Sequence, residues 1–108
     1  MPLRLFTGMR AAQPSHPLFS TGTLKLSDKV QWLDSKGLVD PHRYLHRHLR
    51  GDWGEMDDEG RRANDAAFQS GGLLTSRYAV TRRLSLVVVT NGDRSLTVIQ
   101  LPEENPLL

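Results

Sequence analysis

Residues 84–101 read LSLVVVTNGDRSLTVIQL, and this stretch decides the fold. Apolar and polar side chains alternate on both sides of the turn signal NGDR at 91–94, which is typical of two antiparallel strands joined by a short loop. Residues 86–89 are apolar on both faces of the pleat, which indicates a strand with neighbours on both sides. We therefore expect a hairpin with strands at 84–90 and 95–101.

The length of the hairpin loop sets the register, because a shift in pairing changes which side chains meet. A two-residue Asn-Gly loop would place Leu86 opposite Thr97, whereas a four-residue loop at 91–94 places Leu86 opposite Ile99. The second arrangement pairs apolar side chains with each other. We expect the four-residue loop, with Gly92 at a positive-φ position that reverses the chain.

The regions before the hairpin complete an α+β fold. Residues 73–80 alternate as the hairpin strands do, so we predict a three-stranded antiparallel β-meander in the C-terminal third. Capping signals predict three short helices before it, over 28–36, 41–50 and from about 57 to 70. Residues 18–26 are expected to form an extended entry segment, and an extra N-terminal strand there is an alternative.

The predicted helices differ in the side chains that they turn inward. The second helix is expected to face the core with Leu45 and Leu49, with His48 beside them. The third helix has a small-residue stripe that includes Ala63 and Ala67. Small side chains let a helix approach its neighbour, so we expect this helix to lie tightly on the sheet or on the second helix.

Length and composition limit the class of protein. With 108 residues, 38% hydrophobic and 24% charged, the chain fits one soluble domain without a membrane span. We divide it into a flexible N-terminal extension at 1–17 and a single domain at 18–108. The absence of cysteine excludes disulfides, thiolate nucleophiles and iron–sulfur centres, and it fits a cytoplasmic protein.

Charge is unevenly placed, although the formal net charge is only +2. Arg43, Arg47 and Arg50 lie on the second predicted helix, and four acidic residues follow at 55–59. Such a basic helix can contact phosphates, so a nucleic-acid-binding accessory protein is an alternative function. The chain has few aromatic residues to stack on bases, and the acidic run would repel DNA.

Two histidine arrangements suggest chemistry. His48 and Asp52, with hydroxyls of the hairpin nearby, have the residue types of a base and its orienting carboxylate, so a small hydrolase or transferase is a third candidate. His42 and His46 are spaced i, i+4 as in zinc-binding helices, but no third ligand stands at a telling spacing. We therefore assign no catalytic residue, no metal site and no cofactor.

Asp52, Trp53 and Asn64 are expected to have structural roles. Asp52 follows the glycine that ends the second helix and is suited to cap the next turn, and Trp53 would anchor that turn in the core. Asn64 falls on or beside the buried face of the third helix, where an amide needs partners. We expect it to bond the loop at 52–54.

Three stretches together resemble a known family. They are HLRGDWG at 48–54, NDAA at 64–67, and the segment from 90 to 104. They look like small bacterial proteins carried on plasmids and integrative elements and commonly labelled "type I restriction endonuclease subunit M". A DNA methyltransferase needs a glycine-rich cofactor turn and an Asn/Asp-Pro-Pro-aromatic loop, and this chain has neither.

The resemblance implies a mobile genetic element as the setting. Small proteins encoded there often occlude a host defence complex, such as a restriction or CRISPR machine. The expected function is thus a non-enzymatic, anti-defence interaction module that binds a protein partner. The residues expected to contact that partner lie on the second helix and at the hairpin end: Arg43, Arg47, Arg50, Asp93 and Arg94.

Overall fold

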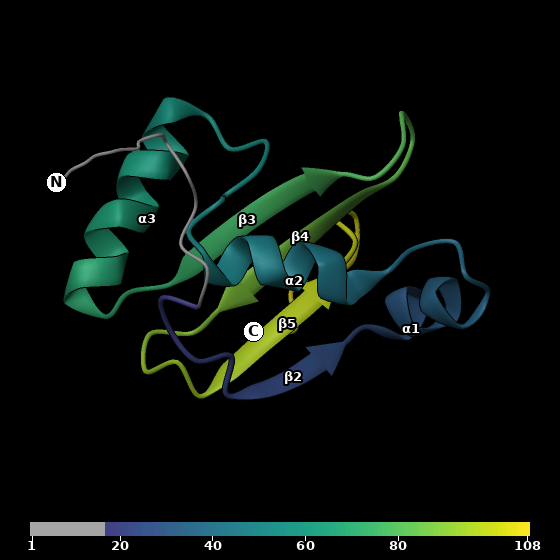
Figure 1. The fold of residues 1–108 in the computed structure, drawn as a ribbon, viewed down its shortest axis with the longest axis horizontal. Coiled ribbons are helices and arrows are strands. Elements are labelled where there is room, and N and C mark those ends of the chain that lie inside the picture. Colours follow the sequence, from purple (N-terminus) through teal and green to yellow (C-terminus); the bar gives the residue numbers. More distant parts are fainter. Residues whose placement is uncertain (1–16) are drawn as a thin grey trace, which may run out of the picture.

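A computed structural model describes residues 17–108, and the expected N-terminal extension at 1–17 lies outside them but for its last residue. The fold is α+β, with three helices and four strands in the described part of the chain (Figure 1). The elements in chain order are β2 (Thr23–Leu26), α1 (Asp28–Ser35), α2 (Pro41–Leu49), α3 (Asp58–Ser70), β3 (Leu74–Ala79), β4 (Ser85–Thr90) and β5 (Leu96–Gln100).

The sheet has the strand order β2-β5-β4-β3. The antiparallel meander of β3, β4 and β5 is present as predicted, but a three-stranded sheet was wrong, because β2 adds a fourth strand parallel to β5. The alternative of an N-terminal strand is the correct one. Leu24 and Leu26 of β2 turn towards the apolar core, so joining the sheet buries them in part.

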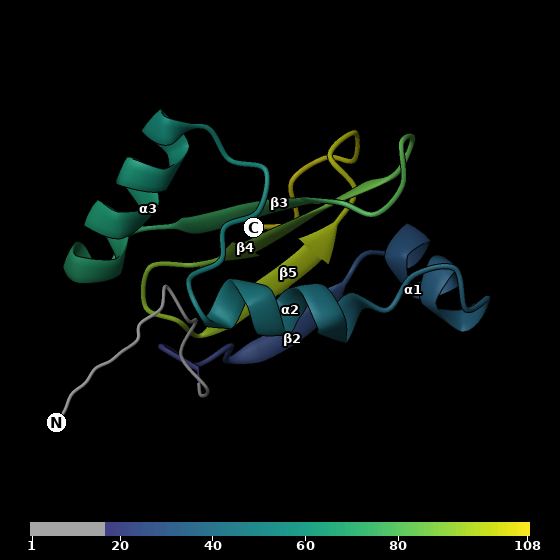
Figure 2. The same cartoon turned by 45° about the horizontal axis from the view of Figure 1, so that its top comes forward.

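The core lies between one face of the sheet and helices α1 and α2. Figures 1 and 2 show α2 lying across that face, α1 beside its end, and α3 standing apart next to β3. Tyr78, Leu86 and Ile99 from the sheet are fully buried, and Leu45 and Leu49 supply the inward face of α2 as predicted.

Helix α3 does not pack as its small residues suggested. Ala63 is exposed and Ala67 only half-buried, and Asn64 is the residue of α3 that is buried. The helix meets the sheet beside β3 rather than on its face (Figure 2). The contact between α3 and the sheet is therefore made by the polar side chain of Asn64, and not by Ala63 and Ala67 as we expected.

The register of the β4–β5 hairpin differs from the predicted one by two residues. Val88 pairs with Ile99 and Thr90 with Thr97, so six residues, 91–96, separate the last pair instead of four, and the first residue of β5, Leu96, is paired with β2 alone. Asn91 holds the longer loop closed, because its side-chain oxygen accepts hydrogen bonds from the amides of Ser95 and Leu96, at 2.9 and 3.1 Å. A shift of two residues keeps the same side chains on each face, and the apolar pattern cannot distinguish the two registers.

Gly92 is required for close approach and not, as predicted, for a positive φ. The positive φ in this loop, 63°, belongs to Arg94. A Cβ at Gly92 would overlap the carbonyl oxygen of Gly71, the residue that ends α3. The hairpin loop therefore touches the C-terminus of α3 backbone to backbone.

Gly92→Ala is expected to lower the free energy of unfolding by about 1 to 3 kcal/mol, because the loop and α3 must separate to admit the methyl group. Urea unfolding followed by circular dichroism measures the change. Wild-type stability in the Gly92→Ala protein would show that the two segments do not touch.

Candidate functional site

The candidate catalytic histidine, His48, lies at the centre of a buried polar network. It is 0% exposed, as are Ser76, Thr90 and Thr97. The Nδ1 atom of His48 is 2.6 Å from Ser76 Oγ, and its Nε2 atom is 2.9 Å from Thr90 Oγ1. Thr90 Oγ1 is in turn 2.8 Å from Thr97 Oγ1. The predicted hydroxyls from the hairpin are therefore present.

The carbonyl at the end of the network fixes the direction of the hydrogen bonds from Thr97 back to Nε2 of His48. The Thr97 hydroxyl donates to the carbonyl oxygen of Thr21 at 2.8 Å, and a carbonyl can only accept. Thr97 therefore accepts from Thr90, and Thr90 accepts from His48. It follows that His48 carries a proton on Nε2, and in the neutral imidazole Nδ1 then accepts from the Ser76 hydroxyl.

The surroundings of His48 keep it neutral. Burial lowers its pKa from the ordinary 6.5 to about 3, and the nearby positive charge of Arg94 acts in the same direction. The rings of Phe19 and Trp53 stand edge-on to the imidazole, at centroid distances of 5.4 and 5.6 Å. An imidazole that is sealed from solvent and bonded at both nitrogens has no position from which to attack or deprotonate a substrate.

Asp52 does not orient His48, because each ring nitrogen already has a hydroxyl partner. Its carboxylate forms an ion pair with Arg47, at 2.6 Å from Nε to Oδ2, and accepts a hydrogen bond from the Gly54 amide. The Asp52 hydrogen bond is the main cause that raises the pKa of Arg47. The expected capping role of Asp52 is thus what its contacts provide.

Trp53 and Asn64 both close the outer edge of β3. Trp53 is 8% exposed, and its carbonyl accepts from the Arg77 amide at 3.2 Å. The Asn64 side chain donates to the Thr75 carbonyl at 2.7 Å and accepts from the Thr75 amide at 3.0 Å. The expectation that Asn64 bonds the loop at 52–54 was wrong, because its side chain pairs with Thr75 of β3. The loop pairs with the same strand at Arg77, two residues further along.

Arg94 was expected to face a partner, but its guanidinium bonds within the chain. It donates to the carbonyl oxygens of Gly72 at 2.6 Å, Asn91 at 2.9 Å and Ala67 at 3.0 Å, and so ties the hairpin loop to the end of α3. It also lies 5.7 Å from the centre of the Phe19 ring. A cation at the C-terminus of a helix is favourable for the helix dipole.

The other residues expected to contact a partner vary in exposure. Arg43 and Asp93 are exposed, whereas Arg47 and Arg50 are half-buried; the Arg50 guanidinium donates to the His46 carbonyl. Hydrogen bonds from Ser95 lower the pKa of Asp93. His42 and His46 are exposed, and among residues 17–108 no three metal-ligating side chains form a group that could hold an ion. Partner contact through Arg43 and Asp93 stays a prediction.

No protein-family model, curated protein or solved structure matches this chain. The resemblance to mobile-element proteins therefore stays a prediction. In the part of the chain that the structure describes, none of the helices has the length and apolar character to cross a membrane.

Sequence reasoning missed the sheet face that points away from α1 and α2. We define the open face by Leu73, Thr75, Val87 and Val89, which line a hollow of about 260 Å³. Leu73 is 54% exposed, and both valines are half-exposed. The signal was present, since residues 86–89 are apolar on both pleat faces. We interpreted that run only as evidence for a central strand.

Proposed function

We propose that this protein acts by binding another protein through the open face of its sheet, and not by catalysis. The observation that supports this most is the apolar surface of the exposed Leu73 and the half-buried Val87 and Val89, on a face that no helix of residues 17–108 covers. Contiguous apolar side chains exposed to water mark interaction surfaces more often than accidents of folding. An enzyme is the weaker reading, because the buried His48 network is closed to substrates.

The biological setting of this proposal comes from the sequence resemblance alone. A small mobile-element protein that blocks a host restriction or CRISPR complex would need a binding surface and no active site. The open face is such a surface. The exposed charges of Arg43 and Asp93 lie away from its apolar centre, and in this proposal they affect the rate of association more than its strength.

The test is capture from the native host with three forms of the protein as bait. Leu73→Glu places a charge on the open face, and Leu38→Glu is its matched control, since Leu38 is 57% exposed and Leu73 is 54% exposed. We expect wild type and Leu38→Glu to retain the same host protein and Leu73→Glu to lose it. Equal capture by all three forms would contradict the proposal.

A salt titration of DNA binding tests the alternative function. Phosphate contacts make log affinity fall steeply with log salt concentration, by about 0.9 for each phosphate neutralised. We expect no retention on duplex DNA at physiological salt. Tight binding with a steep slope that Arg43→Glu reduces would favour the nucleic-acid-binding function instead.

A further inference from the structure

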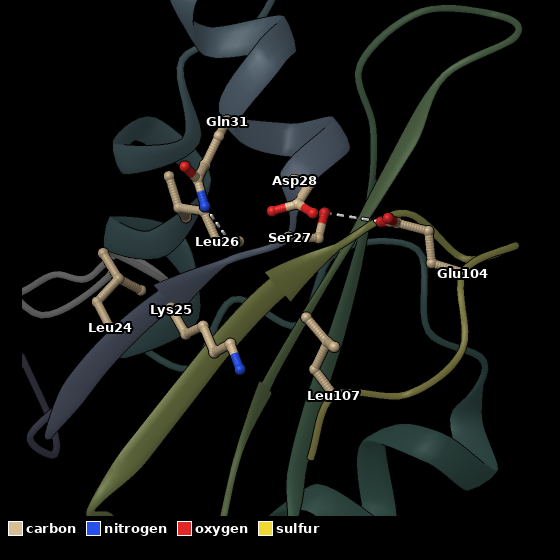
Figure 3. Close-up of a pocket in the computed structure, with 8 residues that line it drawn as sticks. All are labelled: Leu24, Lys25, Leu26, Ser27, Asp28, Gln31, Glu104 and Leu107. Carbon is tan, nitrogen blue, oxygen red and sulfur yellow. Dashed lines mark hydrogen bonds between the residues drawn. The ribbon is translucent and has the colours of Figure 1, made fainter.

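The C-terminal tail, residues 102–108, folds back over the open face and is tied to it by polar contacts. Gln100 points to this face and its side-chain amide donates to the carbonyls of Glu104 and Asn105, at 3.2 and 3.0 Å. Its oxygen accepts from the Leu107 amide at 3.0 Å. Figure 3 shows the second tie, in which Ser27 Oγ donates to the Glu104 carboxylate at 2.7 Å.

The tail lies between two hollows, one that wraps around the edge strand β2 and one on the open face. One, of about 460 Å³, lies along β2 and the start of α1 and is bounded by Lys25 and Leu107 (Figure 3). The other is the hollow of about 260 Å³ over Val89, bounded by Leu108. Glu104 lines both hollows.

The strand register shows that the two hollows meet on the open face, where Lys25 lines one and Val89 the other. Lys25 pairs with Val98, Val98 with Val89, and Val89 with Thr75, so these four side chains form one row across all four strands. The tail crosses this row between its two ends. Without the tail, the hollows would join into a single trough running from β2 to β3.

The hold on the tail is largely polar, and its apolar end is poorly buried. Leu107 and Leu108 are 41% and 39% exposed, although each borders a hollow. Burying an exposed leucine completely is worth about 1.5 to 3 kcal/mol, so much of the available hydrophobic gain is unused. A segment that fills the trough better can therefore displace the tail.

The chemistry of the tail indicates what the trough accepts. Its sequence, PEENPLL, places two acidic residues, which lie in a turn at 102–104, before two leucines in an irregular stretch at 105–108. The trough offers the complement, with valines at its centre and exposed cations at its sides, Lys25 on β2 and Arg77 next to Val87 on β3. Opposite charges at the rim of an apolar groove select a partner and fix its direction.

We propose that the trough binds an extended segment of a partner protein in which acidic residues precede apolar ones, and that the C-terminal tail occupies this site until the segment displaces it. This inference rests on the proposed protein-binding function and names the class of partner segment. The tail then acts as a tethered competitor. A partner segment binds only if its affinity for the trough is high enough to displace the tail.

The experiment uses a labelled peptide with the sequence PEENPLL and fluorescence anisotropy on the full-length protein. A tethered tail competes at about millimolar effective concentration. Leu107→Ser/Leu108→Ser weakens that competitor at two exposed positions, so we expect the peptide to bind this variant about tenfold or more tightly than wild type. Leu73→Glu in the same background should abolish binding, whereas Leu38→Glu should leave it unchanged.

Two further measurements separate the remaining outcomes. A PQQNPLL peptide should bind at least several-fold more weakly, and equal binding would overturn the acidic preference. Light scattering tests whether a second copy of this chain supplies the segment. A wild-type dimer that the Leu107→Ser/Leu108→Ser variant no longer forms would overturn the proposal that the segment belongs to a different protein. Equal peptide affinity for wild type and for the Leu107→Ser/Leu108→Ser variant would overturn the inference. Host capture that depends on Leu73, without any peptide binding, would leave the proposed function intact and refute this inference alone.

Discussion

Replacing His48 by alanine is expected to lower the free energy of unfolding by about 4 kcal/mol or more, enough to unfold a marginal domain. The substitution leaves the hydroxyls of Ser76 and Thr90 without their shared partner at positions that are 0% exposed. Thr90 keeps its hydrogen bond to Thr97, but the Ser76 hydroxyl loses its bond to His48, and an orphaned buried group costs about 1 to 3 kcal/mol. The lost ring contacts with Phe19 and Trp53 and the resulting cavity add to this.

Urea unfolding measures the effect, and His46→Ala is the matched control. His46 lies on the same helix but is exposed, so its replacement should change stability by less than about 0.5 kcal/mol. Two results would contradict the structural role of His48. One is a stability close to that of His46→Ala. The other is a folded His48→Ala protein that still binds its partner and has lost only its biological effect, which would indicate chemistry.

The helices could be predicted because short-range signals specify their ends. Ser27, Asp40 and Asp57 each accept a hydrogen bond from an amide of the helix that follows, as the sequence suggested. Each cap depends on residues two or three positions apart. Such contacts are fixed by the chain itself, so they can be read without knowledge of the remaining fold.

Contacts between distant segments were harder to predict. The pairing of β2 with β5 joins residues more than 70 positions apart, for example Leu26 with Ile99. The alternating pattern of the four residues of β2 does not indicate which strand will pair with it. The hairpin register failed for a related reason. Hydrophobic pairing fits loops of four and six residues equally, and the side-chain bonds of Asn91 decide between them.

The polar residues at the site were recognised, but their partners were not. The position of His48 beside the inward stripe of α2 was predictable from helical spacing, and Asp52 stood nearest to it in the sequence. The real partners, Ser76 and Thr90, lie on adjacent strands 28 and 42 residues away. The short distance in sequence between His48 and Asp52 suggested a catalytic pair. In the fold, His48 instead bonds hydroxyls of two strands in a network closed to solvent.

Acid should destabilise this protein well before its carboxylates titrate, because of His48. Burial holds the pKa of this imidazole at about 3 in the folded state, while the unfolded chain has the ordinary value of 6.5. Between these two values the unfolded state binds a proton that the folded state does not. The contribution of His48 to stability is therefore complete above pH 6.5 and is lost as the pH falls towards 3.

The expected slope approaches about 1.4 kcal/mol for each pH unit in the lower part of this window. Urea unfolding between pH 7 and pH 4.5 measures it while most carboxylates remain ionised. The control is a His42→Gln/His46→Gln protein, in which the two exposed histidines of the same helix are replaced and His48 is kept. His48→Gln, if it folds, should lose most of the slope, because glutamine does not titrate. A slope that persists in His48→Gln would show that another group carries the acid sensitivity, and that the imidazole is not held neutral by its buried hydroxyl network.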